Sequence, residues 1–488
     1  YTDGETVHDR THGVLQNGDN LKGNVSSSQS AIIVPRPTMP ERYFIFTVDK
    51  PNYFDEPNDP IEGVHFSEVD MSLNNGLGGV IPGQKNIPLQ TYDPGDPLEA
   101  EFKSSEKISA IISEECESYW VVTQLGNKFY SFSVSAAGVN TSPVISTVAT
   151  NNRPLLNTQG VNLTAIGYMK ISPDGTKLAA AYAATRLGHP RSGGERKTGK
   201  AFLYDFDNLT GEVSNEKLLL TDTYPYGVEF SPDSKKLYIT SSTFDNADRL
   251  QSGELYQYDI TSGDPAGTER LINSSGNNAG ALQLAPDGKI YRAGYPISGA
   301  AQFKFLSVIN EPDEDGAGVN YDHNSINISP GDVKLGLPSF VQSFFLKSFE
   351  YENICLGDAT KFTISEQGNY DSVIWDFGDG SVSSDESPTH QYADPGTYTV
   401  SLTKFLNGNQ QSPVCKEITI YDIPAVPSGY ILKQCDAQDD DPTDGLTEFN
   451  LQLAKEHLTQ GSLGLQVFFY ENRNAAQNDD QNQNSLSN

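Results

Sequence analysis

The segment Ile171-Ser172-Pro173-Asp174-Gly175 decides the fold, because two more copies of it follow at nearly even spacing. These copies are Phe230-Ser231-Pro232-Asp233-Ser234 and Leu284-Ala285-Pro286-Asp287-Gly288. The second position of the motif recurs after 59 residues (172 to 231) and again after 54 (231 to 285). Proline presets φ for a tight turn, aspartate bonds to nearby backbone, and glycine accepts a positive φ. Each copy therefore predicts a tight turn between two strands of a repeated unit.

The residues around each turn predict several strands per repeat. Each turn is followed by lysine and then by alternating apolar residues, and a further strand is expected at 201–206, 254–259 and 305–309. Three or four strands in every 50–60 residues, repeated in tandem, are typical of β-propeller blades. Less regular units lie upstream, at 30–70 and 108–134.

The number of blades follows from two partial units at the ends. Residues 1–9 resemble the outer remnant of one blade, and Gly336-Leu337-Pro338-Ser339-Phe340 is expected to begin a last one. The count is then seven, and we predict an all-β, seven-bladed β-propeller over residues 1–348. Two stacked sandwiches are the alternative, although sandwiches rarely repeat one turn motif at even spacing.

The segment after Glu350 has a different pattern. Val373-Ile374-Trp375-Asp376-Phe377-Gly378-Asp379-Gly380 is followed by a strand of alternating residues, Gly396-Thr397-Tyr398-Thr399-Val400-Ser401-Leu402. A buried tryptophan strand, a Gly-Asp-Gly hairpin and an alternating strand predict a small β-sandwich. This stretch closely resembles the PKD domain, an Ig-like extracellular fold, and we assign it residues 349–423.

The remaining residues, 424–488, are expected to form an incomplete second Ig-like module with a polar tail. A short helix at 451–459 with Asn450 as its N-cap and a strand at 465–470 are predicted within it. The tail after residue 472 is rich in Asn and Gln and has too little apolar content to fold unaided.

The charge of the chain limits its partners. Lys and Arg total 33 and Asp and Glu total 64, which gives a net charge of −31. Such a surface repels phosphate backbones and anionic headgroups, so we expect neither nucleic-acid binding nor membrane insertion. The aliphatic run 31–34 is far shorter than the roughly 20 residues of a membrane helix.

Motifs for catalysis are missing from the sequence, so we predict a protein that is not an enzyme and carries no cofactor apart from a candidate calcium site. There is no Gly-x-Ser-x-Gly elbow. The loop after residue 310 places Asp313, Asp315 and Asp322 at positions 3, 5 and 12 of an EF-hand-like pattern. Flanking helices are not apparent, so a plain acidic hairpin loop is the alternative to calcium binding.

The four cysteines allow one pairing prediction. Cys355 and Cys415 lie near the first and last strands of the PKD-like segment, and these strands are close together in Ig-like sandwiches. We therefore expect a disulfide between Cys355 and Cys415, as suits an exported protein. Cys116 is expected to be a free thiol in the core.

The arrangement as a whole resembles a family of large secreted surface proteins. Segments such as 23–35, 167–180, 226–238 and 280–291 are similar to the propeller regions of Bacteroidetes proteins that include gliding-motility adhesins. In that family a propeller precedes PKD and Ig-like repeats, and a C-terminal signal directs export by the type IX secretion system.

The resemblance implies a non-enzymatic protein at the cell surface, associated with the outer membrane, that acts in adhesion, in gliding-associated surface structure or in docking. Secretion or anchoring proteins of the outer membrane would hold it through a C-terminal region that this sequence lacks. The propeller would contact a glycan or protein ligand. A glycan-binding, glycan-hydrolysing or peptide-hydrolysing propeller enzyme is the alternative.

Overall fold

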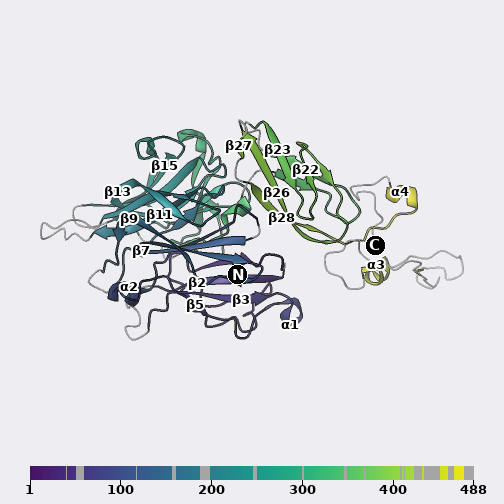
Figure 1. Ribbon diagram of the computed structural model, residues 1–488, viewed down its shortest axis with the longest axis horizontal. Helices are drawn as coiled ribbons and strands as arrows, with labels where there is room; N and C mark the ends of the chain where they lie inside the picture. Colours follow the sequence, from purple (N-terminus) through teal and green to yellow (C-terminus); the bar gives the residue numbers. More distant parts are fainter. Residues whose placement is uncertain are drawn as a thin grey trace, which may run out of the picture. The chain divides into compact units, whose positions relative to one another are not determined.

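The chain is all-β apart from short helices (Figure 1). The computed structural model describes residues 1–39, 41–50, 60–116, 118–156, 161–186, 198–245, 250–298, 302–345, 349–365, 370–406, 409–410, 413–422, 431–432, 451–459 and 467–477. It forms two compact units, residues 1–420 and 421–488, and each is described by itself. No helix in the described residues has the length and apolar character needed to cross a membrane.

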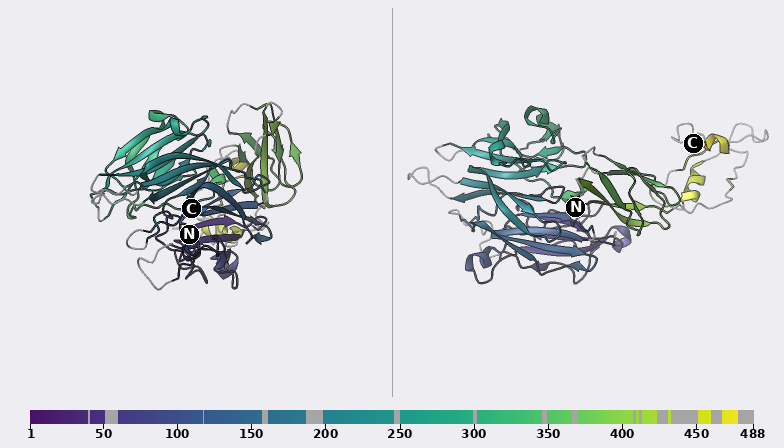
Figure 2. Two further views of the ribbon diagram at one scale, coloured as in Figure 1. Left: turned by 60° about the vertical axis from the view of Figure 1, so that its left-hand side comes forward. Right: turned by 45° about the horizontal axis from the view of Figure 1, so that its top comes forward.

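The first unit begins with consecutive antiparallel sheets, which Figures 1 and 2 colour from purple through teal to green. Sheet 1 contains β1 (Ala31–Pro35), β2 (Arg42–Val48), β3 (Val64–Asp70), β4 (Gly79–Val80) and β5 (Ile87–Leu89). Sheet 2 contains β6 (Ile108–Ile112), β7 (Ser118–Ser135), β8 (Gly138–Val139) and β9 (Val144–Asn152). The short helix α1 (Leu73–Gly76) connects β3 to β4 within sheet 1, and α2 (Pro97–Phe102) lies between the two sheets in the chain.

The next two sheets share one long strand. Sheet 3 contains β10 (Met169–Ile171), β11 (Lys177–Arg186), β12 (Thr198–Phe206) and the first part of β13 (Val213–Phe230). Sheet 4 contains the last part of β13, from Tyr224, with β14 (Lys236–Phe244), β15 (Leu250–Asp259) and β16 (Arg270–Ser275). Sheet 5 contains β17 (Leu282–Leu284), β18 (Ile290–Arg292), β19 (Phe305–Ile309) and β20 (Tyr321–Asn327).

Successive sheets pack face to face, with one apolar layer between each pair. Sheets 1 and 2 share a cluster that includes Phe46 and Tyr130, and sheets 2 and 3 share one that includes Phe129 and Phe202. Two more clusters join sheet 3 to sheet 4 and sheet 4 to sheet 5. This serial stacking of antiparallel sheets is the packing expected of propeller blades.

The three copies of the turn motif occupy equivalent places, as predicted. They connect β10 to β11, β13 to β14 and β17 to β18, which are the first two strands of sheets 3, 4 and 5. Within the first copy, the Ser172 hydroxyl donates to Asp174 Oδ1 at 2.6 Å. The Asp174 amide in turn donates to Ser234 Oγ of the next copy at 3.0 Å, so neighbouring turns touch.

The closed ring of seven blades is not confirmed. The described residues before 349 form five such sheets when β13 is counted in both sheets that share it. Residues 1–21 form isolated bridges rather than strands, and Val7, Leu15 and Leu21 cover the far side of sheet 1. The stretch 336–340, expected to begin a last blade, is not a strand.

Residues 335–343 instead form a crossing segment that bonds to parts of all five sheets. Its polar groups reach a residue two positions before β1, the end of β6, the residue before β10, β13 and the residue before β17. The bonds are Gln29 to Ser339, Ile112 to Ser343, Tyr168 to Leu337, Gln342 to Glu229 and Ala281 to Leu335. These bonds tie the segment to residues in or beside the strands of five sheets.

A buried ion pair lies where the crossing segment meets sheets 3 and 4. Lys170 Nζ lies 3.0 Å from Glu229 Oε2, and the two side chains are 1% and 0% exposed. Lys170 also donates to Gln283 Oε1 of sheet 5 at 2.6 Å, and Gln342 donates to Glu229 Oε1 at 2.6 Å. The pair thus bridges three sheets and the crossing segment.

Residues 349–420 form a two-layer sandwich with its own core around Trp375. One layer contains β21 (Phe349–Glu352), β22 (Thr360–Ile364) and β25 (Thr389–His390). The other contains β23 (Ser372–Asp376), β24 (Val382–Ser383), β26 (Gly396–Leu406), β27 (Asn409–Gln410) and β28 (Val414–Ile420). The Trp375 ring lies 5.0 Å from that of Phe349 and 5.5 Å from that of Phe362.

The second unit contains the helices α3 (Leu451–Thr459) and α4 (Arg473–Gln477). The predicted helix at 451–459 is confirmed, whereas its cap Asn450 lies outside the described residues. The described part of the predicted strand, 467–470, is not extended in a sheet. Most of the predicted Ig-like module at 424–488 lies outside the described residues.

We expect Glu229→Ala to lower the free energy of unfolding by about 3–5 kcal/mol, because it leaves the Lys170 charge buried without its partner. The double variant Lys170→Met, Glu229→Met is expected to recover most of this loss. Urea unfolding measures both. Lys361→Met, which removes an exposed pair with Glu352, is the control and is expected to cost less than about 1 kcal/mol. A loss for Glu229→Ala as small as that control would contradict the role given to the pair.

Candidate functional site

The three aspartates predicted to bind calcium bond to different protein groups. Asp313 Oδ1 accepts the Asp233 amide at 3.1 Å, and Asp315 Oδ1 lies 2.9 Å from Lys236 Nζ. Asp322 Oδ2 accepts from Asn310 at 3.0 Å within its own hairpin. In the part of the chain that the structure describes, no group of three His, Cys, Asp or Glu side chains could hold a metal ion. The structure thus does not bring these carboxylates together as ligands.

The acidic loop that contains Asp313 and Asp315 docks sheet 5 onto sheet 4. The Tyr238 hydroxyl donates to the carbonyl of Pro312 at 2.7 Å, and the Gln257 amide donates to the carbonyl of Glu314 at 2.6 Å. Both donors come from sheet 4. The acidic residues of the loop therefore hold two sheets together.

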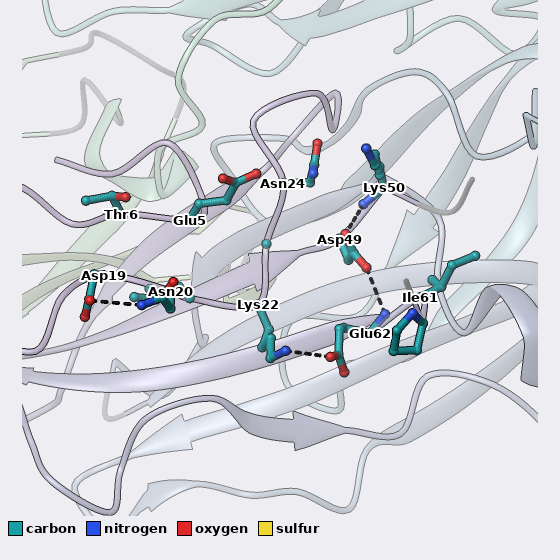
Figure 3. A pocket seen from close by; sticks show the side chains of 13 residues that line it. Glu5, Thr6, Asp19, Asn20, Lys22, Asn24, Asp49, Lys50, Ile61 and Glu62 are labelled. Atoms are coloured by element: carbon teal, nitrogen blue, oxygen red, sulfur yellow. Dashed lines mark hydrogen bonds and ion pairs between the residues drawn. The ribbon is translucent and has the colours of Figure 1, made fainter. Parts of the chain in front are cut away.

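A polar hollow of about 510 Å³ opens beside sheet 1 (Figure 3). Lys22 and Glu62 point toward each other across it, with 2.6 Å between Nζ and Oε1. Asp49 accepts the backbone amides of Lys50 and Glu62, each at 2.8 Å. Glu5 and Asp19, at the other side in Figure 3, add two more carboxylates to the lining.

The pKa values of Asp49 and Glu62, two carboxylates of this hollow, are shifted in opposite directions. Burial raises the pKa of Asp49, although the two amide hydrogens act against that effect. The hydrogen bond from Lys22 lowers the pKa of Glu62 below its usual value. Two carboxyl groups whose pKa values are shifted apart in one hollow are the pairing that acid–base hydrolysis uses.

The predicted disulfide between Cys355 and Cys415 is wrong. Cys415 is bonded to Cys116, with 5.8 Å between their Cα atoms and a sequence separation of 299. Cys355 is exposed and unpaired, and Cys116, expected to be a free thiol, is bonded. The bond therefore links the turn after β6 in sheet 2 to strand β28 of the Trp375 sandwich.

The alternation of β28 explains the pairing. Ile418 and Ile420 point into the core around Trp375, so Cys415, an odd number of residues away, points out of the opposite face. The layer that contains β21, close to Cys355, packs on the core side. Cys415 instead packs into the apolar cluster of sheets 1 and 2.

Beside this disulfide lies a groove of about 1200 Å³ between the sandwich and sheets 1 and 2. The turn after β1 and the turn after β7 form one wall, and strands β23, β26 and β28 form the other. Cys116 is part of the lining. The groove contains the carboxylates of Glu115, Asp376 and Glu417.

A lysine with an unusual pKa lies just before β6. Burial lowers the pKa of Lys107 to about 7, although the charge of Glu106 acts in the other direction. Lys107 Nζ donates to the carbonyls of Thr164 and Ala165 at 3.1 and 2.7 Å and lies 4.6 Å from the centre of the Tyr182 ring. A lysine titrating near neutrality is a common catalytic base, but this side chain is fully buried and holds backbone carbonyls.

The sequence contains a signal for the buried polar groups that the turn motif alone does not show. Lys170, Glu229 and Gln283 each stand three residues before the proline of a turn copy, within an otherwise apolar strand. Polar side chains at one repeat position, in strands that are buried, must meet one another or stay unsatisfied. The repeat alone could thus have placed them together.

The family of the Trp375 sandwich follows from a comparison of its sequence with family models. Residues 347–419 match the family model described as the PKD domain. This segment is a PKD domain. Its Gly378 has φ +79°, and a Cβ there would lie 2.6 Å from the carbonyl oxygen of Thr399, so the Asp-Phe-Gly-Asp-Gly hairpin requires glycine.

Known proteins are similar to parts of the chain. A 73-residue stretch is 38% identical to Collagenase ColA of Bacillus cereus, which is 15% of this chain and 7% of that protein. The chain thus spans less than a tenth of that relative. The PKD1 domain of Vibrio anguillarum Epp is 28% identical, covers 15% of this chain and 90% of its own, and has a TM-score of 0.14. The β-propeller domain of the Trilobed protease from Pyrococcus furiosus is 11% identical, covers 81% and 99%, and has a TM-score of 0.28.

Removing the disulfide is expected to destabilise the chain. Cys116→Ser with Cys415→Ser opens a loop whose ends are 299 positions apart, and the chain-entropy model puts the loss of unfolding free energy at about 5–6 kcal/mol. Cys355→Ser is the matched control and is expected to leave stability unchanged. Non-reducing peptide mapping by mass spectrometry checks the pairing itself. A peptide joining Cys355 to Cys415 would overturn it.

Lys107 is expected to make stability rise with pH above neutrality. Its folded pKa of about 7 lies below the usual 10.5, so the unfolded chain binds more protons between these values and stability increases as pH rises through that window. Lys107→Met should therefore gain more stability at pH 6 than at pH 9.5, measured by urea unfolding. Lys334→Met, at an exposed site, is the control. Equal gains at both pH values would contradict the assignment.

Proposed function

We propose that this protein is a non-enzymatic extracellular surface protein whose sheets and PKD domain act as one binding unit. The observation that carries the proposal is the Cys116–Cys415 disulfide. Such bonds persist in oxidising compartments outside the cytoplasm, and this one joins two separately folded cores. A covalent link between domains suits a protein that must transmit force or hold a partner outside the cell.

The PKD domain and the charge support the same role. Collagenase ColA, to which 73 residues of this chain are 38% identical, acts on collagen by its name, and residues 347–419 match the PKD domain. A net charge of −31 favours neutral or cationic partners and disfavours nucleic acid. We propose export by a type IX-like system and attachment through outer-membrane secretion or anchoring proteins. The task would be adhesion, gliding-associated surface structure or docking, with the sheets arranged as a propeller.

A second candidate function rests on the hollow of Figure 3. Asp49, with its raised pKa, and Glu62, with its lowered pKa, could serve as acid and base in hydrolysis of a glycan or peptide. The ion pair between Lys22 and Glu62 occupies one of these carboxylates, which makes binding the better-supported role.

Localisation and deletion in the native host test the proposal. Protease treatment of intact cells should remove an epitope placed in the full-length protein, and deleting residues 1–348 should impair attachment or motility. Hydrolytic activities of the cells should not change. The binding role would be wrong if the purified chain turned over a glycan or peptide and Asp49→Asn abolished that turnover while the control Asp222→Asn, at an exposed site outside the hollow, did not.

A further inference from the structure

One wall of the disulfide-bordered groove is a flat polar face of the PKD domain. Along β26 and β28, residues alternate between the core around Trp375 and this opposite face. The strand register sets three pairs of small or acidic side chains on the face. They are Ser401 with Cys415, Thr399 with Glu417, and Thr397 with Thr419. Asp376 of β23 extends the first row, since it pairs with Ser401.

The other wall does not neutralise this face. Arg36, the basic residue lining the groove, donates to Glu68 Oε1 at 2.6 Å and to the carbonyl of Ala136 at 2.8 Å. Its charge is therefore balanced on its own side by a carboxylate of β3. The groove keeps the charges of Glu115, Asp376 and Glu417.

Glu417 is a carboxylate of the groove that has no cationic partner among the described residues. No ion pair or hydrogen bond joins its side chain to another described residue, although the side chain is exposed on the groove. Partial desolvation by the surrounding protein raises the pKa of Glu417. The pKa of Tyr43 on the facing wall is raised first by burial and second by the charge of Glu417. The carboxylate thus lies in partly desolvated surroundings between two walls.

We propose that this groove binds an extended cationic peptide segment of a protein partner, with a lysine or arginine side chain paired to Glu417. The inference rests on the proposed function, which it deepens by naming the class of partner. The groove volume of about 1200 Å³ has room for several residues, and its hydroxyl-lined strand face offers hydrogen bonds to an extended backbone. A neutral glycan would leave the carboxylate without a counter-charge, whereas a lysine would supply one.

The disulfide makes such binding favourable by fixing the walls. Both walls are held at one end by Cys116–Cys415, so closing the groove around a ligand requires little ordering of the domains. Preorganisation of this kind raises affinity by lowering the entropic cost of association.

Fluorescence anisotropy with the full chain tests the proposal. The probe is a labelled octapeptide of alternating lysine and threonine at 150 mM salt, with a glutamate–threonine octapeptide and a glucose hexasaccharide as comparisons. We expect only the lysine peptide to bind. Glu417→Lys should weaken it about tenfold and Glu417→Gln about fivefold, whereas Glu101→Lys, the same charge change on exposed α2, should weaken it less than about twofold.

Two results would overturn the proposal. Equal losses for Glu417→Lys and Glu101→Lys would mean that the lysine peptide binds through net charge alone. Binding of the hexasaccharide that Glu417→Gln abolishes would assign the groove to glycans. Because Glu417 has no partner in the described residues, its variants are expected to fold, and their melting temperatures check this. Absence of peptide binding by a protein that is exported and supports attachment would defeat this inference alone.

Discussion

The buried pair of Lys170 and Glu229 is the constraint on which sheets 3, 4 and 5 depend. Each sheet shares an apolar layer with its neighbour, and such layers alone tolerate sliding. A buried ion pair does not tolerate sliding, because a shift of one residue in β10 or β13 would turn Lys170 or Glu229 away from its partner. The pair, with Gln283 and Gln342, fixes the register of three sheets and the path of residues 335–343 together.

Local patterns predicted those parts of the fold that local chemistry determines. The turn copies at 171–175, 230–234 and 284–288 correctly placed the first hairpin of three sheets, and the Trp375 motif correctly gave a PKD domain. The structure of residues 336–340 depends instead on contacts with residues that are distant in the sequence. Their partners, such as Tyr168 and Ala281, lie on distant sheets, so no periodicity in the segment could show that it crosses the sheets instead of beginning a blade.

The cysteine error has a different cause, because the information was present in the sequence. Ile418 and Ile420 are the apolar residues of β28, and counting back by two from them reaches Lys416, which leaves Cys415 on the other face. The predicted pairing used the short distance between the first and last strands, but it ignored the face of the strand from which each cysteine side chain points. The acidic loop shows the same limit for the calcium prediction: spacing placed Asp313 and Asp315 near each other in sequence, while Lys236 and Asp233, their actual partners, come from another sheet.

The outward direction of Cys415 also determines what the PKD domain can present. A strand face that carries Cys415, Glu417 and Thr419 needs cover for the cysteine, which sheets 1 and 2 provide through Cys116. The same contact brings Glu417 close to a second wall whose arginine is already paired with Glu68. Joining the domains therefore creates an acidic groove as a direct consequence of the bond. Arg36 lies on the facing wall, but its guanidinium bonds to Glu68 of β3 and not to a carboxylate of the groove. A disulfide that served stability alone would not require the groove to keep this excess negative charge. The unbalanced charge is the feature that a cationic partner would complete.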